Sequence, residues 1–244
     1  MAVDLQRIEE LVRARFNLAK VNLYKVAKSF ALNESAISDT IPGYSARTLN
    51  FGSYDEDRFA VLFVDMRRST SRAEKMGPKK TFLSMHAFIP ALLAVVEDYD
   101  GYVIDIMGDG LMVFFGGKSS GITNAKASQN AGLCGLDMIK VVDGVVNKIL
   151  VENDILDKIA IGVGCDFGDV IVTKIGTDGT YDTKAYGNCI NKASKFADEA
   201  GAGFVKVSKE INNYWPTSKG GKIGFTKQGE GFLITHIPTM ANGC

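Results

Sequence analysis

The chain has 244 residues, of which 46% are hydrophobic and 23% charged, a composition typical of globular proteins rather than disordered or fibrous ones. Lysine plus arginine and aspartate plus glutamate number 28 each, so no excess of charge favours nucleic acid or an anionic membrane as partner. Four cysteines without CxxC spacing predict free thiols rather than a zinc site. Residues 1–32 carry charges throughout, and the longest apolar run, 89–96, is too short to span a bilayer. We therefore expect a cytoplasmic protein without a membrane span.

Residues 4–30 place apolar side chains at helical spacing, which predicts one or two helices. Such a stripe usually packs on its own domain, and a dimer or partner contact is the alternative. Residues 32–53 are rich in Ser, Asn, Gly and Asp, as connectors are. We place the domain boundary here, with an N-terminal helical extension and connector over 1–50 and the main domain over 51–244.

An apolar run followed by an aspartate occurs twice. Residues 59–64 read as a central strand buried on both faces, and Asp65 follows it. Residues 101–116 read as a β-hairpin whose tip carries Asp109. A Gly-Asp-Gly turn alone is usually a surface turn, but two aspartates at the ends of buried strands can meet on adjacent strands. There they can hold a divalent metal ion.

The other predicted elements complete the fold class. After Asp65 a helical region breaks at Gly77 and Pro78, and a second helix over 79–97 bends at Pro90. Further elements are a helix within 123–150, a strand pair 159–167 and 170–175 turning at Gly168, a strand at 181–186, a helix over 188–200, a strand and helix within 205–212, and strands at 224–227 and 231–237. This order predicts an α/β (α+β) sandwich with a largely antiparallel sheet and helices on one side.

Four segments together resemble the class III nucleotidyl cyclase catalytic domain over roughly residues 59–237. They are the strand and loop Phe-Val-Asp-Met-Arg-Arg-Ser-Thr at 63–70, the hairpin at 101–109, the Gly-Ile-x-x-Gly-x-Val-like segment at 162–170 and Gly-Asn-Cys-Ile-Asn-Lys-Ala-Ser-Lys at 187–195. Each is weak alone, whereas four in the right order are specific. The resemblance implies a ferredoxin-like core flanked by helices, which makes residues 51–244 a cyclase catalytic domain.

In such an enzyme the ribose 3′-hydroxyl attacks the α-phosphate of its own triphosphate and expels pyrophosphate. The resemblance implies two Mg²⁺ or Mn²⁺ ions per site, held by Asp65 and Asp109 with help from the Met66 carbonyl. It also implies phosphate binding by the loop and helix start that follow the strand, with a looser match at a later lysine. The phosphate-binding candidates are Arg67, Arg68, Ser69, Thr70 and Lys227.

The resemblance places the other catalytic residues on the helix at 188–200. Asn191 would orient the ribose, and Lys195 stands where the family has an arginine that stabilises charge on the α-phosphorus. Lysine keeps the charge but loses the bidentate fork, and a solvated helix face is the alternative reading of Lys195. In the family these residues and the two aspartates come from opposite subunits, which implies a homodimer with shared sites.

Two further positions choose the base in the family, and here they are Asp105 and Lys184. A carboxylate accepts hydrogen bonds and an ammonium donates them, so the pair favours an N–H beside a carbonyl, as in guanine or uracil. An ion pair between the two residues, with the base read elsewhere, is the alternative.

Asp105 and Lys184 match neither the adenylyl nor the guanylyl cyclase signature at these two positions. In this the chain resembles the bacterial Pycsar pyrimidine cyclases of antiphage defence, whose cyclic nucleotide is read by a separate effector. UTP is the favoured substrate. A guanylate or cytidylate cyclase and an inactive nucleotide-binding regulator are the alternatives.

Overall fold

The computed structural model describes residues 3–24, 40–45, 48–215 and 222–236. Its helices are Leu5–Tyr24 (α1), Ser69–Asp98 (α2), Asn124–Val141 (α3), the π-helical turn Val142–Val146 (η1), Asn147–Val151 (α4), Asn188–Glu199 (α5) and Lys209–Asn213 (α6). Its strands are Thr40–Ile41 (β1), Tyr44–Ser45 (β2), Tyr54–Met66 (β3), Tyr102–Ile106 (β4), Gly110–Gly116 (β5), Ile161–Thr177 (β6), Thr180–Tyr186 (β7), Phe204–Val207 (β8), Ile223–Gln228 (β9) and Gly231–His236 (β10).

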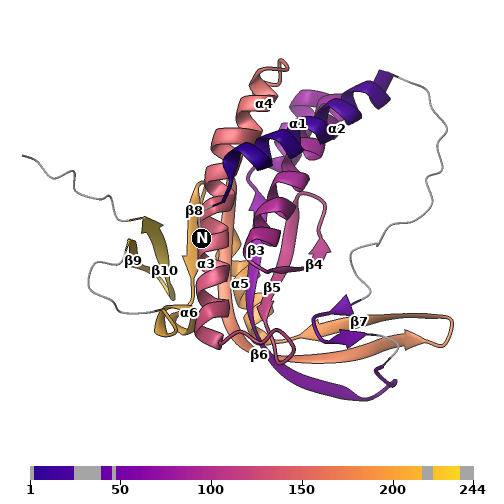
Figure 1. The fold of residues 1–244 in the computed structure, drawn as a ribbon, viewed down its shortest axis with the longest axis vertical. Coiled ribbons are helices and arrows are strands. Elements are labelled where there is room, and N and C mark those ends of the chain that lie inside the picture. The colour runs from indigo at the N-terminus through magenta and orange to yellow at the C-terminus, as the bar shows by residue number, and fades with distance from the viewer. Residues whose placement is uncertain (1–2, 25–39, 46–47, 216–221, 237–244) are drawn as a thin grey trace, which may run out of the picture.

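One eight-stranded sheet organises the molecule (Figure 1). Its order is β4-β5-β3-β6-β8-β10-β9, with β7 pairing with the second half of β6. All neighbours are antiparallel except β6 and β8, which are parallel. The predicted class, a mixed α/β fold with a mostly antiparallel sheet flanked by helices, is confirmed.

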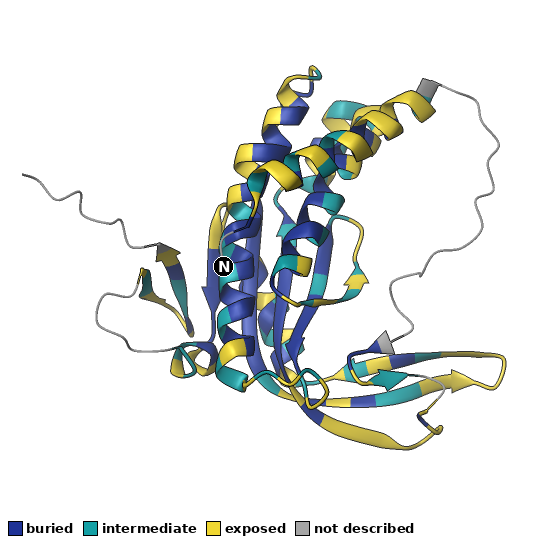
Figure 2. Ribbon diagram, in the orientation of Figure 1, coloured by how far each residue is buried: buried dark blue, intermediate teal, exposed yellow. Residues whose placement is uncertain are grey.

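Residues 59–64 of the central strand β3 are buried on both faces, as their apolar run predicts, because successive side chains point to opposite sides. Ala60, Leu62 and Val64 join the core under α1, α2 and α3. Phe59 and Phe63 join a second core that α5 covers. The prediction of helices on one side is therefore wrong, since helices pack on both faces. Figure 2 shows this burial in the body of the fold and exposed residues along the hairpin formed by the second half of β6 and β7.

The predicted turn at Gly168 is wrong. Strand β6 runs through this point without interruption, with Gly168 opposite Phe59 and Asp169 opposite Arg58 of β3. The Arg58 guanidinium lies 3.0 Å from the Asp169 carboxylate. Pairing along the whole of β3 therefore overrides a local turn signal, and the hairpin closes further along, between β6 and β7.

Helix α2 is kinked at Gly77, which has φ +74°, so the predicted break is confirmed. By length and composition alone, α2 is long and apolar enough to cross a membrane, although half of its most apolar window is buried inside the fold. Its buried residues, among them Phe88 and Leu92, belong to the main core. The core-facing position of α2 accounts for its apolar composition.

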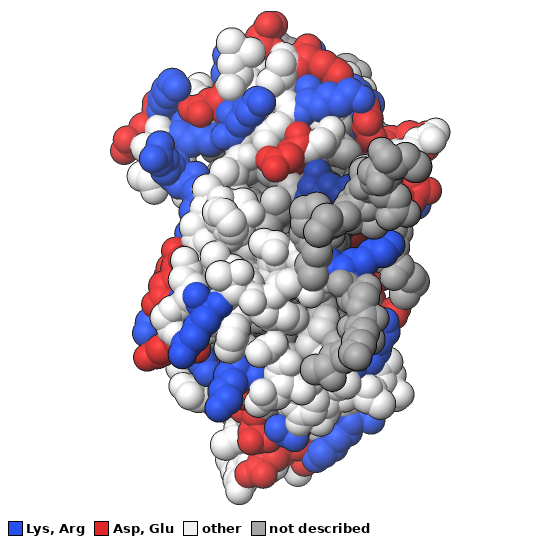
Figure 3. Space-filling view, turned by 90° about the vertical axis from the view of Figure 1, so that its left-hand side faces the viewer, with Lys and Arg blue, Asp and Glu red and all other residues white. Residues whose placement is uncertain are grey.

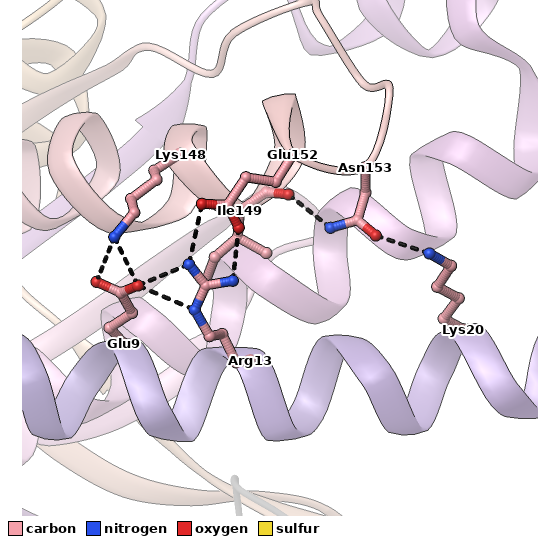
Figure 4. A network of polar contacts seen from close by, with 7 residues as sticks. All are labelled: Glu9, Arg13, Lys20, Lys148, Ile149, Glu152 and Asn153. Atoms are coloured by element: carbon pink, nitrogen blue, oxygen red, sulfur yellow. Dashed lines mark hydrogen bonds and ion pairs between the residues drawn. The ribbon is translucent and has the colours of Figure 1, made fainter.

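Helix α1 packs on this core through Ile8, Val12 and Phe16, so its apolar stripe does contact the chain's own domain. Polar contacts hold its other side (Figure 4). Arg13 lies 2.7 Å from Glu9 and 2.6 Å from Glu152, and Lys148 lies 2.8 Å from Glu9. Residues 25–30 of the predicted helix lie outside the described part, and the boundary at 50/51 stays a prediction.

Charges of both signs are mixed on the face shown in Figure 3, in keeping with the equal totals in the sequence. Three of the cysteines, Cys134, Cys165 and Cys189, are buried and free, as predicted. Cys244 lies outside the described residues.

Candidate active site

The two predicted metal-binding aspartates lie side by side at one end of the sheet. Asp65 is opposite Gly110, the first residue of β5, and the Met66 N–H donates to the Asp109 carbonyl at 3.2 Å. Burial raises the pKa of Asp65, the neighbouring charge of Asp109 raises it further, and Arg67 lowers it. The turn therefore holds a carboxylate against another negative charge, as metal-binding carboxylates often are.

This donor set fits a hard divalent cation. Among the described residues, no group of three or more His, Cys, Asp or Glu side chains gathers as a metal site. Mg²⁺ is commonly held by one or two carboxylates, with waters and substrate phosphates completing its shell. Asp65 and Asp109 supply two carboxylates, and a cation between them would relieve the repulsion that raises the pKa of Asp65. The part predicted for the Met66 carbonyl stays a prediction.

The loop after β3 offers fewer phosphate-binding groups than predicted. The backbone N–H of Met66 is bonded to Asp109 and that of Arg67 to Ala160 at 2.8 Å. The Arg67 guanidinium donates to the Ala197 carbonyl and lies 3.6 Å from Asp65. The backbone N–H and one guanidinium nitrogen of Arg67 therefore have protein partners in this structure, and its assignment to phosphate stays a prediction.

The start of α2 remains open. Arg68 is its N-cap residue, with φ +57°, and makes no side-chain capping bond. Apart from bonds within the turn and helix themselves, the backbone N–H groups of Ser69 and Thr70 have no hydrogen-bond partner among the described residues. First-turn N–H groups and the helix dipole favour anions, so Arg68, Ser69 and Thr70 keep the phosphate-binding prediction.

The predicted catalytic residues of α5 lie apart from the acidic pair. Lys195 is 59% exposed and lies 3.7 Å from Glu199 and 3.9 Å from Glu230. Asn191 is exposed and lines a cavity of about 450 Å³ with Ala185 and Tyr186 at the end of β7 and the residues that follow them. No hydrogen bond or ion pair joins either residue to Asp65 or Asp109 within the described ranges. The same helix does reach the acidic pair at its far end, where Arg67 meets Ala197.

The base-selecting candidates are brought near one another. Lys184 lies 2.6 Å from Asp182, and this bond, followed by the charges of Asp182 and Asp105, raises the pKa of Lys184. The direct ion pair between Lys184 and Asp105 considered above does not form. Sequence reasoning missed Asp182, although its position two residues before Lys184 on one strand was the available signal. Lys227, on β9, is exposed and belongs to the same hairpin as Glu230.

Comparison with known proteins places these features in a family. The model of the adenylate and guanylate cyclase catalytic domain matches residues 52–233. A cytidylate cyclase of Staphylococcus aureus is 30% identical over 156 residues, covering 63% of this chain and 36% of that protein. An adenylate cyclase of Anabaena cylindrica is 21% identical over 201 residues, covering 80% and 37%. This chain thus spans little more than a third of either relative's length.

Solved structures share the fold. The adenylyl cyclase CyaB from P. aeruginosa superposes with a TM-score of 0.65 at 21% identity, over 75% of this chain and 94% of that one. The guanylyl cyclase Cya2 gives 0.61 at 20% identity, over 74% and 91%. The family match covers most of the sheet and both aspartate-bearing strand ends, and the chain belongs to the adenylate and guanylate cyclase catalytic domain family.

Proposed function

We propose that this protein converts a nucleoside triphosphate to a 3′,5′-cyclic nucleotide and pyrophosphate. One observation carries the proposal: Asp65 and Asp109 lie together at paired strand ends beside the open N-terminus of α2, in a chain of the cyclase family. The bound Mg²⁺ or Mn²⁺ ions would activate the 3′-hydroxyl and neutralise the leaving phosphates. The first-turn N–H groups of Ser69 and Thr70 would bind phosphate oxygens.

The site is proposed to form between two copies of the chain. Asn191 would orient the ribose, and Lys195 would stabilise charge on the α-phosphate, both from the partner copy. The support is that each set is incomplete alone. Among the described residues, the only cation paired with Asp65 is Arg67, whose guanidinium also donates to the Ala197 carbonyl. Lys195 is exposed with only glutamate partners within the described residues. A symmetric dimer would form two equivalent sites.

The proposed base is uracil. The Asp105 carboxylate accepts a hydrogen bond. It therefore suits the N3–H of uracil, and it does not suit the N3 of cytosine, which carries no hydrogen. The Lys184 ammonium donates one N–H to Asp182 and has further N–H groups that can donate to the O4 carbonyl of uracil. Guanine presents the same pattern in a larger ring. The second candidate is CTP, favoured by the 30% identical relative that is named a cytidylate cyclase.

A product of this kind would act as a signal read by a separate cyclic-nucleotide-binding effector, and we propose a role in cytoplasmic antiphage defence. The catalytic part is tested by incubating the purified chain with Mn²⁺ and each of ATP, CTP, GTP and UTP, with products resolved by mass. Cyclic UMP as main product supports the base assignment. Cyclic CMP or GMP overturns that assignment and keeps the cyclase. If no nucleotide gives a product, and Asp65→Ala cannot be distinguished from wild type in this assay, the proposed cyclase activity is overturned.

A further inference from the structure

A buried lysine lies beneath the helix that carries Lys195. Among the lysines that the structure describes, Lys206 alone is buried, with 3% of its surface exposed. It belongs to β8 and pairs with Gly164 of β6, where the absence of a side chain leaves room for the backbone of α5. A buried ammonium is costly unless an opposite charge pairs with it. The partner of Lys206 therefore bears on its role.

That partner is Glu199, the last residue of α5. The Lys206 ammonium lies 2.6 Å from the Glu199 carboxylate and 4.9 Å from the centroid of the Phe196 ring. The β9–β10 hairpin lies against its aliphatic stem, since a Cβ added to Gly231 would be 3.2 Å from the Lys206 Cε. The hydrogen bond from Lys206 is the main cause that lowers the pKa of Glu199. The carboxylate is thus held, ionised, from inside the fold.

The same carboxylate faces two lysines. Its Oε2 lies 2.6 Å from Lys206, whereas its Oε1 lies 3.7 Å from Lys195, one turn earlier on α5. The first distance is that of a charge-assisted hydrogen bond, and the second is too long for one. The charge of Lys206 therefore compensates that of Glu199. Lys195, whose other contact is Glu230 at 3.9 Å, keeps its own charge for another anion.

Removal of the buried charge would change this balance. Without Lys206, the nearest cation to Glu199 among the described residues would be Lys195, at the spacing at which helical side chains form ion pairs. The carboxylate would then hold the ammonium in place. Its uncompensated negative charge would also repel any phosphate that approached Lys195, and this repulsion grows when a bound ligand excludes water.

We propose that Lys206 and Glu199 are positioning residues for Lys195. The buried lysine holds the Glu199 carboxylate to itself, so that the Lys195 ammonium stays free to meet the α-phosphate. This rests on the proposed function, in which Lys195 stabilises charge on that phosphate. Neither residue touches the substrate, and both act only through Lys195.

The test compares wild type, Lys206→Met, Glu199→Gln and the double variant with the nucleotide that gives most product. Methionine replaces the buried stem without its charge. We expect Lys206→Met to lower kcat about fivefold or more, with KM changed less than about twofold. Adding Glu199→Gln should restore kcat to within about twofold of wild type, because no carboxylate then holds Lys195. Glu199→Gln alone should keep kcat but lower the Tm, since it leaves a buried ammonium without its counter-charge.

A matched control is Glu210→Gln. Glu210 lies 3.2 Å from Lys192, another lysine of α5, so this variant loosens the helix without changing the charges around Lys195. Its kcat should stay within about twofold of wild type. A loss as large as that of Lys206→Met would show that any loosened contact of α5 lowers kcat, and would overturn the proposal.

Two further results would overturn it. One is a wild-type kcat in Lys206→Met. The other is a loss that Glu199→Gln does not restore, since that loss would come from altered packing.

A readout without turnover separates this proposal from the cyclase activity. The rate at which an acylating reagent modifies Lys195, followed by peptide mass, should fall about threefold or more in Lys206→Met and recover in the double variant, because a paired ammonium is a poorer nucleophile. A chain that shows this pattern but makes no cyclic nucleotide retains the positioning pair and loses the proposed function. An active chain without the pattern loses only the positioning pair.

Discussion

Substitution of Gly110 by alanine should damage the site without touching a catalytic side chain. Gly110 faces Asp65 across the β3–β5 ladder. An added Cβ would lie 3.4 Å from the Val64 carbonyl carbon and 3.5 Å from the Asp65 Cα, and closer still to the Val64 carbonyl oxygen. Backbone cannot rotate away as a side chain can, so β5 must move from β3 at the point that sets the spacing of Asp65 and Asp109.

The expected losses of stability and of activity follow from this clash. Overpacking of this kind destabilises by about 1–3 kcal/mol, and a displacement of about 1 Å between reacting groups can lower activity roughly 100-fold. We therefore expect Gly110→Ala to fold with a lowered Tm and to lose most cyclic-nucleotide formation at saturating Mn²⁺. Thermal unfolding and initial rates, measured on the same preparation, give the two quantities.

Two glycines provide controls. Gly144 has no atom within 4 Å of an added Cβ, so Gly144→Ala should leave both quantities near wild type. Gly108, in the same turn as Asp109, also has open space but a φ of +66°. Gly108→Ala should cost about 1 kcal/mol of backbone strain with a smaller loss of rate. Wild-type activity in Gly110→Ala would refute the reasoning that strand spacing positions the acidic pair.

Three further predictions test the roles of single residues. Mixing inactive Asp65→Ala and Lys195→Ala chains in equal amounts should restore about a quarter of wild-type activity, because about half of the dimers are mixed and each has one intact site; no recovery contradicts a shared site. Asp65→Asn should abolish activity yet raise the Tm of the metal-free protein at neutral pH. The pKa of Asp65 is raised in the folded state, so the ionised carboxylate destabilises the fold at pH values above that pKa. The gain in Tm from Asp65→Asn should therefore disappear as the pH falls below the ordinary pKa of aspartate. A lowered Tm at neutral pH contradicts this prediction. Lys195→Arg should increase kcat several-fold by supplying the fork that lysine lacks, and a loss of activity in rate assays would count against Lys195 facing the α-phosphate.

The strand ends could be predicted because their signals are local. An apolar run that stops at Asp65, and a hairpin tip that carries Asp109, each reveal a strand boundary within a few residues. The sheet then brings the two together through one ladder. The same local reading failed at Gly168, where turn-forming residues sit inside a strand because the long β3 pairs with them on both sides of that point.

The hydrogen-bond partners of individual side chains could not be predicted in the same way. Nothing near Arg67 in sequence indicates that its backbone N–H donates to Ala160 and its guanidinium to Ala197, which come from distant parts of the chain. The sequence reading did not group Arg68, Arg72 and Lys75, although their spacing places them on one face of a helix. Lys158 comes from a distant loop, and only the fold brings it into the same cavity lining as these three residues.

The distribution of charge gives a physical reason for the proposed dimer. At one end of each chain, Asp65 and Asp109 form a negative half-site in which burial and mutual repulsion raise the pKa of Asp65. On α5 of the same chain, Lys195 projects into solvent with weak contacts to Glu199 and Glu230. Exposed pairs at these distances contribute little, so Lys195 can exchange them for a phosphate at small cost. A triphosphate and its metal ions, bound between an acidic half-site and a cationic one from a second copy, would compensate both charges at once. Neither half can do so alone.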